Sequence, residues 1–527
     1  MTNAEAIVSE LARLGVERVF GVPGGEVTLL LDACRRVGIP FYSVGHEASA
    51  AFMAATTGQL AGIPGACLAT VGPGAVNLGI GVAHALLDRA PVVALTAQVP
   101  VSLMPHFSHQ RLPLDRFFGS LCKWSVTLDG RQTVEAVRQA AAVATSPPPG
   151  PVHVALPSDL AGDRPRPGPG AAGWPQGKPA GGSSASLADV AGLLARSHRP
   201  LVVAGLGCTP RDVPVLRTFV DRTGIPYVVT PKAKGTLPED TPSFLGVVGG
   251  MAIDPAVMAN VDEADFLLGV GFDPVECDKD WYLGRPMACL GRWSTAEGAY
   301  RPVEVVGDIA ASLAGLAGSA GAVRWPPDLL ARCRERIRPS PLPPRDGLSP
   351  LESLRALREA APPETLLACD VGSHKYFAGQ FWPCRDPQTF LVSNGLSGMG
   401  YGLPAAIAAK LHAPRRPVLA LLGDGGFLMS LHALTCMRQH RIPVAVVVFV
   451  DGSLSLIRIA QQRRGVEPYG VEFPPPDFAA VARGFGVEGV AVRSLDELKR
   501  AVDRFLRDEA PVVISVPVDV REYEAYC

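Results

Sequence analysis

The stretch from Val418 to Asp451 constrains this chain more than any other, because it has the pattern of two buried strands joined by a helix. An apolar run from Val418 to Leu422 stops at Gly423-Asp424-Gly425-Gly426, a helical pattern continues to about His440, and a second apolar run covers Val444 to Val450. Aliphatic, β-branched runs without alternation are typical of strands buried in a parallel sheet. The sequence therefore predicts a βαβ crossover whose two strands end at the same edge of one sheet.

Two acidic residues follow these strands directly. Asp424 comes after the first strand and Asp451 after the second, on the side where open α/β sheets bind ligands. The glycines beside Asp424 open a helix, whose free N–H groups attract phosphate. Two carboxylates beside a phosphate site predict an oxygen-liganded Mg²⁺. A Gly-Asp-Gly turn alone is a weak signal, and at this point a plain strand-to-helix turn is the alternative.

Composition narrows the class of protein. The chain has 527 residues, a net charge of −1 and 19% charged residues, which argues against a nucleic-acid or anionic-membrane partner. No apolar stretch reaches the roughly 18 residues that a membrane span needs, and the N-terminus has the pattern of an amphipathic helix rather than a signal peptide. The eleven cysteines are scattered without a Cys-x-x-Cys pair, which is typical of reduced thiols and predicts a cytoplasmic protein.

Strand-like and helical segments alternate along three parts of the chain, residues 1–160, 187–325 and 348–527. This alternation predicts an α/β fold with three doubly wound parallel-sheet domains. Pro- and Gly-rich linkers separate them at 160–186 and 338–347. In the middle part, Gly205-x-Gly207 lacks the third glycine and the acid of a dinucleotide fingerprint, so it indicates a plain strand-to-helix turn.

Several motifs resemble those of the thiamine-diphosphate (ThDP) enzymes of the acetohydroxyacid-synthase (acetolactate-synthase) type. The cofactor motif of that family is Gly-Asp-Gly followed by an Asn-Asn or Asn-Asp pair, and here Asp451 lies 27 residues after Asp424. The stretches GHEASAAFMAA, TVGPGAVNLGIGVAHALLDRAPVVALTAQVP and SNGLSGMGYGLPAAIAAKL are also similar to the family. The resemblance covers nearly the whole chain. It implies a pyrimidine-binding domain (1–160), a Rossmann-like middle domain (187–325) and a diphosphate-binding domain (348–527). It also implies a homodimer as the minimum assembly, with a homotetramer as the larger alternative, because the family binds its cofactor between subunits.

The resemblance also implies roles for individual residues. Mg²⁺ would be bound by Asp424, Asp451 and the carbonyl of Ser453, although Val450 stands where the family has its first Asn. Glu47 would lie against N1′ of the cofactor's aminopyrimidine ring, where a carboxyl can share a proton. Without the resemblance, its sequence context indicates a solvated surface residue. Met399 would support the bend of the cofactor, or else it fills a core gap. The other implied cofactor contacts are Pro23, Gly24, Thr70, Pro73, Asn77, Ser373, His374, Gly398, Gly423, Gly425, Gly426, Leu454 and Ser455.

Two features bear on substrate binding, the loop that contains Gln110 and the unusual residue Glu26. Gln110 matches a loop Gln near the reacting carbon, and its neighbour His109 can move protons around neutral pH, as can His106 with less support. Glu26 departs from the family, which generally has a small apolar residue after Pro-Gly-Gly. Its carboxylate has three interpretations: it points to solvent, it pairs with Arg111 or Arg458 in a contact between subunits, or it faces the substrate pocket and disfavours an anionic second substrate.

The sequence thus predicts a ThDP- and Mg²⁺-dependent enzyme that decarboxylates a 2-oxo acid and joins the product to a second carbonyl compound. A simple 2-oxo-acid decarboxylase and a carboxyethylarginine-synthase-like enzyme are the nearest alternatives. A non-enzymatic relative is the alternative from another class, but Glu47 and both metal-binding acids are present. FAD is not expected, because the stretch from Val270 to Glu276 lacks the Arg that FAD-holding relatives tend to carry.

Overall fold

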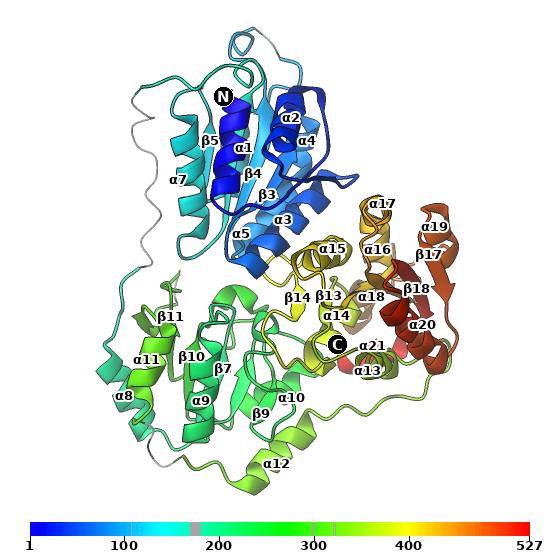
Figure 1. Ribbon diagram of the computed structural model, residues 1–527. Helices are drawn as coiled ribbons and strands as arrows, with labels where there is room; N and C mark the ends of the chain where they lie inside the picture. The colour runs from blue at the N-terminus through cyan, green and yellow to red at the C-terminus, as the bar shows by residue number, and fades with distance from the viewer. Residues whose placement is uncertain (107, 169–180, 298–299, 320, 322) are drawn as a thin grey trace. The chain divides into compact units, whose positions relative to one another are not determined.

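The computed structural model describes residues 1–106, 108–168, 181–297, 300–319, 321 and 323–527 (Figure 1). The chain divides into two compact units, which are described separately. The first unit comprises Met1–Pro179, Leu396–Arg415 and Met429–Pro443, and the second comprises Ala180–Gly395, Arg416–Leu428 and Val444–Cys527. Residues 169–180 of the predicted first linker lie outside the described residues.

The first unit is built on a six-stranded sheet with the order β2-β1-β3-β4-β6-β5, in which every pair is parallel. Its central strands β3, β4 and β6 are buried along their whole length, as apolar runs predict for a sheet covered on both faces. The strands are β1 (Val19–Gly21), β2 (Phe41–Ser43), β3 (Gly65–Ala69), β4 (Val92–Gln98), β5 (Trp124–Thr127) and β6 (Pro151–Pro157), and the helices are α1 (Asn3–Arg13), α2 (Thr28–Val37), α3 (Glu47–Ala61), α4 (Pro73–Asn77), α5 (Gly79–Leu87), α6 (Leu114–Gly119) and α7 (Thr133–Thr145).

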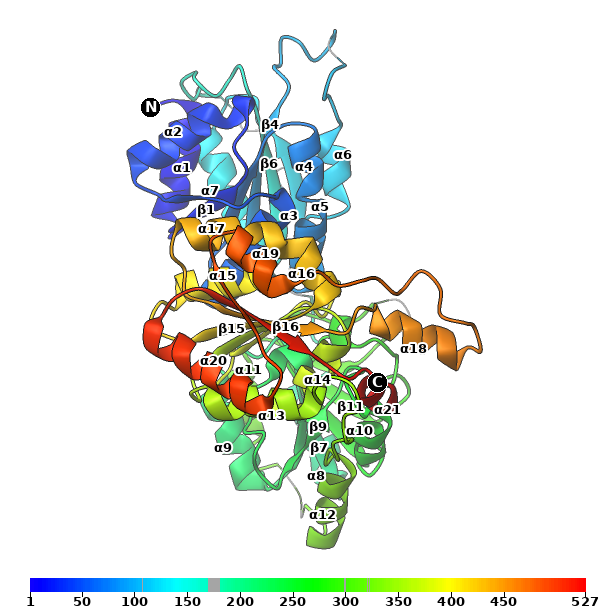
Figure 2. The same ribbon diagram turned by 90° about the vertical axis from the view of Figure 1, so that its right-hand side faces the viewer.

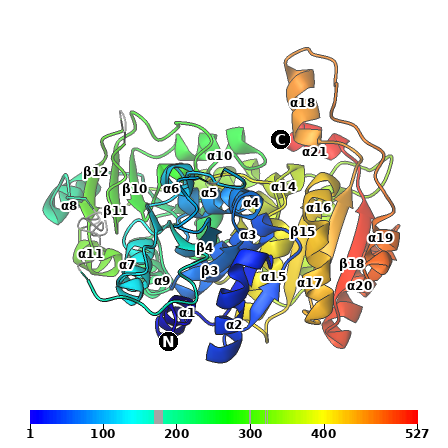
Figure 3. The same cartoon turned by 90° about the horizontal axis from the view of Figure 1, so that it is seen from above.

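Helices cover both faces of this sheet. The apolar faces of α1, α2 and α7 share one core with the sheet, while α3 and α5 lie on the other side (Figure 3). The α3 helix is rich in alanine, and this lets its neighbours approach closely. A Cβ added at Gly81 of α5 would lie 2.4 Å from Cβ of Ala51. The helix α15 (Gly402–His412) also packs on α3, with the Phe52 and Tyr401 rings edge to face at 5.7 Å. The small residues of α3 therefore set the spacing of this layer.

The second unit contains two more parallel six-stranded sheets. The middle sheet has the order β12-β11-β10-β7-β8-β9, and the third has β14-β13-β15-β16-β18-β17. The middle-sheet strands are β7 (Pro200–Ala204), β8 (Tyr227–Val229), β9 (Phe244–Val247), β10 (Phe266–Val270), β11 (Met287–Gly291) and β12 (Val303–Val306). The third-sheet strands are β13 (Leu366–Cys369), β14 (Phe390–Val392), β15 (Val418–Gly423), β16 (Ala445–Val450), β17 (Glu488–Ala491) and β18 (Val512–Pro517).

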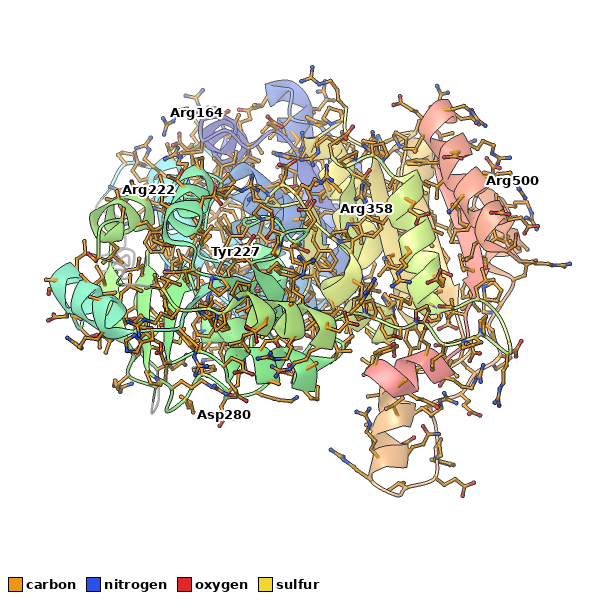
Figure 4. The ribbon with its side chains drawn as sticks, turned by 90° about the horizontal axis from the view of Figure 1, so that it is seen from below. Arg164, Arg222, Tyr227, Asp280, Arg358 and Arg500 are labelled. Carbon is orange, nitrogen blue, oxygen red and sulfur yellow. The ribbon has the colours of Figure 1, made fainter. Side chains whose placement is uncertain are left out.

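Helices flank these two sheets as well. In the third domain, α13 and α20 pack together on one face, and α19 packs against β17 and β18 (Figure 2). Arg358, labelled in Figure 4, belongs to α13. Its guanidinium lies 4.7 Å over the Trp382 ring, a cation–π contact. The helices are α8 (Leu187–Arg196), α9 (Val213–Thr223), α10 (Asp254–Val261), α11 (Ile309–Leu316), α12 (Pro327–Arg336), α13 (Pro350–Ala360), α14 (Ser373–Phe381), α18 (Ser455–Arg463), α19 (Phe478–Gly484), α20 (Leu495–Asp508) and α21 (Arg521–Tyr526).

The predicted crossover after β15 is present, but its helix is not continuous. It consists of α16 (Asp424–Ser430), a 3₁₀ turn (Leu431–Ala433) and α17 (Leu434–Gln439). Ser430 has φ −125° and ψ −2°, outside the helical region, and this breaks the hydrogen-bond ladder. The expectation of one helix to about His440 was therefore too simple.

All three sheets are doubly wound, which confirms the predicted fold class. Strand order reverses between β1 and β3, between β7 and β10, and between β13 and β15. Ligands of open α/β sheets bind in the crevice at such switch points, beyond the carboxyl ends of the strands. The domain boundaries themselves stay a prediction. No helix in the described part of the chain is both long and apolar enough to cross a bilayer.

Candidate functional site

The carboxylate of Asp424 joins the ends of two neighbouring strands in the third sheet. Asp424 is the first residue of α16, directly after β15, and its side chain is 2% exposed. One oxygen accepts the N–H of Gly425 at 2.7 Å, and the other accepts those of Asp451 and Gly452 at 3.1 and 2.7 Å. Burial raises the pKa of this carboxyl in spite of these bonds.

Asp451 provides a second, half-buried carboxylate beside the first. It follows β16 and accepts the N–H of Ser453 at 3.0 Å and the hydroxyl of Ser455 at 2.7 Å. Burial and the charge of Asp424 raise the pKa of Asp451 to about 6. Two such groups repel one another when both are ionised, so a cation between them would remove an unfavourable interaction.

The loop after Asp451 supplies further oxygens. The Ser453 hydroxyl is buried and has no hydrogen-bond partner, whereas the Leu454 N–H donates to the Val471 carbonyl at 2.8 Å and is therefore already used. Among the described residues, no three His, Cys, Asp or Glu side chains form a metal cage. The two carboxylates and this loop fit a divalent cation that takes its other ligands from a backbone carbonyl, phosphate or water, as Mg²⁺ does.

Two polar atoms without hydrogen-bond partners follow β13, on the other side of the switch point. Ser373 and His374 open α14, and Ser373 Oγ and His374 Nε2 are buried without a hydrogen-bond partner. Burial lowers the pKa of His374 to about 3, so its ring is neutral at physiological pH. A Cβ at Gly423 would lie 3.2 Å from this ring, so the glycine leaves room beside it. The ring donates its one N–H to the Asp370 carbonyl, so Nε2 carries the lone pair and the Ser373 hydroxyl is the unsatisfied donor. A hydroxyl donor at the start of a helix fits an anionic group such as phosphate.

Two residues of this edge were missed from the sequence. Asp370 follows β13 directly, and a Cβ added at Gly426 would lie only 2.1 Å from its Oδ2. The strand-end rule that identified Asp424 could have identified Asp370 as well. Tyr523 of α21 is buried near the acid pair, and burial and the charge of Asp451 raise its pKa. It comes from the C-terminal helix, and no local signal predicted this proximity.

Glu47 and Asn77 form the centre of the corresponding edge in the first unit. Glu47 is the first residue of α3 and is 7% exposed, so it is not the solvated surface residue that its sequence context alone indicates. Its Oε2 accepts a hydrogen bond from Nδ2 of Asn77 at 2.9 Å. A Cβ at Gly74 would lie 3.1 Å from Glu47 Oε1 and 2.9 Å from the Thr70 methyl group. Glu47, Thr70 and Asn77, predicted separately, are thus brought together around Gly74.

The turn after β1 contacts Thr70 at the same edge of the sheet. A Cβ at Gly24 would lie 2.5 Å from Cβ of Thr70, so this position requires glycine, and the Thr70 hydroxyl donates a short hydrogen bond to Glu26. Pro23 is exposed, and Pro73 begins α4, where its fixed φ suits a helix start. Within the chain, Arg111 donates to the Met104 carbonyl and Arg458 pairs with Glu524. Each arginine thus has another partner here, and a pairing of Glu26 with either of them between subunits stays a prediction.

The predicted substrate loop lies over the turn after β3. Gln110 has φ +57°, and its Cβ is 2.9 Å from where a Cβ at Gly72 would be, so only glycine fits beneath it. Gln110, His109 and His106 are exposed side chains of this loop. The structure thus brings Gln110 to the edge that carries Thr70, and the proton-transfer role of His109 stays a prediction.

The loop with Gly398 and Met399 belongs to the first unit and packs on the helix that begins with Glu47. A Cβ at Gly398 would contact Phe52 of α3 and Ile80 of α5, each at 3.7 Å. Met399 is half-buried. The loop that the sequence assigned to supporting the cofactor therefore lies against α3, while the role of Met399 as a support stays a prediction.

Family models match three parts of the chain. The thiamine pyrophosphate enzyme N-terminal TPP binding domain matches residues 1–116, the central domain matches 187–316, and the C-terminal TPP binding domain matches 370–516. Each match covers most of the strands of one of the three sheets.

Curated relatives match over almost the whole chain. The acetolactate synthase of Bacillus subtilis (strain 168) is 31% identical, with 98% of this chain and 93% of the relative covered. The acetolactate synthase isozyme 2 large subunit of Escherichia coli (strain K12) is 30% identical over 99% and 96%, and the catabolic acetolactate synthase of Raoultella terrigena is 32% identical over 99% and 95%. With the three domain matches and these full-length similarities, the chain belongs to the thiamine pyrophosphate enzyme family and is similar throughout to its acetolactate synthases.

Proposed function

We propose that this protein is a ThDP- and Mg²⁺-dependent enzyme that decarboxylates a 2-oxo acid and joins the remaining fragment to a second carbonyl compound. The observation that carries the proposal is the pair of complementary half-sites at the switch points of two sheets. One holds the neighbouring acids Asp424 and Asp451, and the other holds the Glu47–Asn77 pair. The full-length similarity to acetolactate synthases supports carboligation over simple decarboxylation.

The residues of the third sheet fit a metal-bound diphosphate. Asp424, Asp451 and the Ser453 carbonyl would hold Mg²⁺, the Ser373 hydroxyl would donate to a phosphate oxygen, and His374 would lie against the diphosphate. The raised pKa of Asp451 and the unpartnered Ser373 hydroxyl support this assignment, because a cation and an anion satisfy both. Bound ThDP would supply the electron sink that loss of CO₂ from a 2-oxo acid requires.

The residues of the first sheet would hold a proton near the cofactor and orient the substrate. Glu47 would hold a proton at its Oε1, the oxygen beside Gly74, because Oε2 already accepts from Asn77. Asn77 thereby fixes the carboxyl group in one orientation. Gln110, in the loop over Gly72, would orient a substrate carbonyl through its amide.

We propose that the protein binds no FAD, since the side chain of Glu276 fills the switch point of the middle sheet. Gly205 and Gly207 pack against the Gly271 carbonyl, and the carboxylate of Glu276 accepts the Leu206 N–H at 2.9 Å. Glu276 also accepts the Thr230 hydroxyl at 2.5 Å and the Lys232 N–H at 2.9 Å. These are the donors that a nucleotide phosphate would need. A stoichiometric flavin absorbance band in the purified protein would contradict this proposal.

We infer a homodimer as the minimum assembly, with a tetramer as the larger alternative, in which each chain contributes its two half-sites to different cofactors. Val76 and Ile80, which flank the site residue Asn77 in sequence, are 40% and 45% exposed, and apolar side chains on such a face fit a subunit interface. The eleven cysteines are free thiols, in keeping with a reducing, cytoplasmic location.

The proposed function is tested in two steps. Calorimetry with ThDP, with and without Mg²⁺, measures whether the cofactor binds and whether binding needs the metal. A panel of 2-oxo acids, followed by mass spectrometry, then distinguishes a carboligation product from an aldehyde, and adding an amine tests the carboxyethylarginine-synthase-like alternative. Absence of Mg²⁺-dependent ThDP binding would contradict the proposal.

A further inference from the structure

Glu26 occupies the switch point of the first sheet. It follows β1, and its hydrogen-bond partner Thr70 follows β3, the strand on the other side of the reversal in strand order. The equivalent position in the third sheet is the contact between Asp370, after β13, and Gly426, after β15. Because switch points are where open α/β sheets bind ligands, the Glu26 carboxylate lies in the ligand crevice rather than on an unrelated surface.

The contacts of Thr70 connect Glu26 to the residues already assigned to the site. The methyl group of Thr70 and Oε1 of Glu47 both lie next to Gly74, and the Gly72 turn, two residues after Thr70, lies beneath Gln110. Glu26 is half-buried, and the Thr70 bond holds its side chain in this position. It is therefore a second carboxylate on the edge that carries Glu47.

No cation neutralises this carboxylate in the described part of the first unit. Five arginines of the unit pair with other acids: Arg13 and Arg138 with Glu10, Arg18 with Glu17, and Arg35 and Arg36 with Asp32. None of the ion pairs formed by the described residues involves Glu26. The edge therefore presents uncompensated negative charge to whatever approaches it, and a partly buried charge is screened less than an exposed one.

We propose that Glu26 sets the charge preference for the second substrate, so that the acceptor is a carbonyl compound without a carboxylate next to its carbonyl. This inference rests on the proposed carboligation. The donor's bond to its carboxylate carbon breaks and CO₂ leaves. The electron pair left behind forms the new carbon–carbon bond to the acceptor carbonyl carbon, and the acceptor oxygen takes up one proton. A second 2-oxo acid would bring its own carboxylate towards Glu26, whereas an aldehyde of the same shape would not.

The experiment compares two matched acceptors in competition. 2-Oxobutyrate and propanal differ only in the carboxylate, and product mass spectrometry gives the ratio in which the enzyme uses them with one donor. We expect Glu26→Gln to shift this ratio at least about tenfold towards 2-oxobutyrate, since it removes the charge and keeps the shape. Glu26→Asp keeps the charge and should retain the wild-type preference within a few-fold. Glu17→Gln removes an exposed charge of the same unit and should leave the ratio as it is.

Two further measurements separate the ways in which the inference can fail. CO₂ release reports on the donor half of the reaction, and calorimetry reports on ThDP affinity in the same variants. A ratio that stays the same in Glu26→Gln overturns the inference, as does a shifted ratio accompanied by an equal loss of ThDP affinity, because Glu26 would then act through the cofactor. A wild-type protein that binds no ThDP or releases no CO₂ would instead contradict the proposed function.

Discussion

The first and third sheets have the same strand order but different chemistry at their strand ends. In chain order within each sheet, both read 2-1-3-4-6-5, and all pairs are parallel. After the strand in third position, the first sheet continues with Thr70 and the Pro73 helix, whereas the third continues with Asp424 and two glycines. The backbone frame is thus shared, and the residues just beyond it decide what each edge can bind.

The two edges differ in the charge of the groups that lie side by side. In the third sheet two acids lie side by side, and both have raised pKa values because of burial. In the first sheet Glu47 is paired with the neutral amide of Asn77. An acid pair suits a metal ion, and a carboxyl oriented by a neutral amide suits proton exchange. The comparison therefore separates a binding edge from a chemical edge, and mutations on the two edges should affect different measurements.

The largest effect is expected from Asp424→Ala, which should abolish ThDP binding. Asp424 accepts three N–H groups that connect β15 to the loop after β16, and it is one of the two proposed metal ligands. Without it the metal loses a ligand, and the diphosphate faces Asp451 with weaker compensation. We expect an affinity loss of at least about a hundredfold by calorimetry, and Asp328→Ala on the exposed surface of α12 serves as the control. Retained ThDP affinity would remove Mg²⁺ bridging from the proposal.

Glu47→Gln should have the opposite profile, with binding kept and chemistry lost. Gln fits the same volume and can still bond Asn77, but it cannot exchange a proton. We expect ThDP affinity within a few-fold of the wild-type value and turnover reduced by about 10² to 10⁴, the usual range for loss of a general acid or base. Exchange of the cofactor C2 proton, followed by NMR, reports on the step directly. Exchange at the wild-type rate would exclude this role for Glu47.

Matched glycine substitutions test both edges with one added methyl group. At Gly426 a Cβ would lie 2.1 Å from Asp370 Oδ2, whereas at Gly74 the nearest atoms are 2.9 and 3.1 Å away on Thr70 and Glu47. Gly426→Ala should lower ThDP affinity at least about tenfold. Gly74→Ala should displace the Glu47 carboxyl by less than Gly426→Ala displaces Asp370. It should slow C2 proton exchange several-fold and change ThDP affinity less than Gly426→Ala does.

The control for this pair is Gly484→Ala, because nothing lies within 4 Å of an added Cβ there. We expect its free energy of unfolding to stay within about 0.5 kcal/mol of the wild-type value, as for surface substitutions generally. Equal losses of affinity in Gly426→Ala and Gly74→Ala would contradict the division into a binding edge and a chemical edge.

Much of this arrangement followed from the sequence. Apolar runs predicted β15 and β16 to within a residue, and the strand-end rule identified Asp424 and Asp451. The sequence does not identify short strands such as β9, β11, β14 and β17, because three to five residues are too few to give a periodic signal. The fold class was therefore predictable from the longest strands alone.

Contacts between distant residues were the part that could not be predicted. The bond from Thr70 to Glu26 and the approach of Gly426 to Asp370 depend on which strands become neighbours at a switch point. Glu47 was assigned its role by family resemblance, whereas its burial and its Asn77 partner required the structure. The local sequence pattern identifies candidate site residues, and the order of the strands determines which of these residues contact one another.

The smallest expected effect concerns the middle sheet, whose switch point is closed by Glu276 instead of being open to a ligand. Burial raises the pKa of Glu276 to about 7 from its ordinary value of 4.5. Because the folded state then holds the proton more tightly than the unfolded state, this group stabilises the fold fully below pH 4.5, and its contribution falls as the pH rises to about 7. Glu276→Gln does not titrate. We therefore expect the difference in unfolding free energy, wild type minus variant, to fall by about 2 to 3 kcal/mol between pH 4.5 and pH 8. Denaturant unfolding at a series of pH values measures this, with Glu17→Gln as the exposed control, and a difference that does not change with pH would show that Glu276 is not held as a buried carboxyl at the middle switch point.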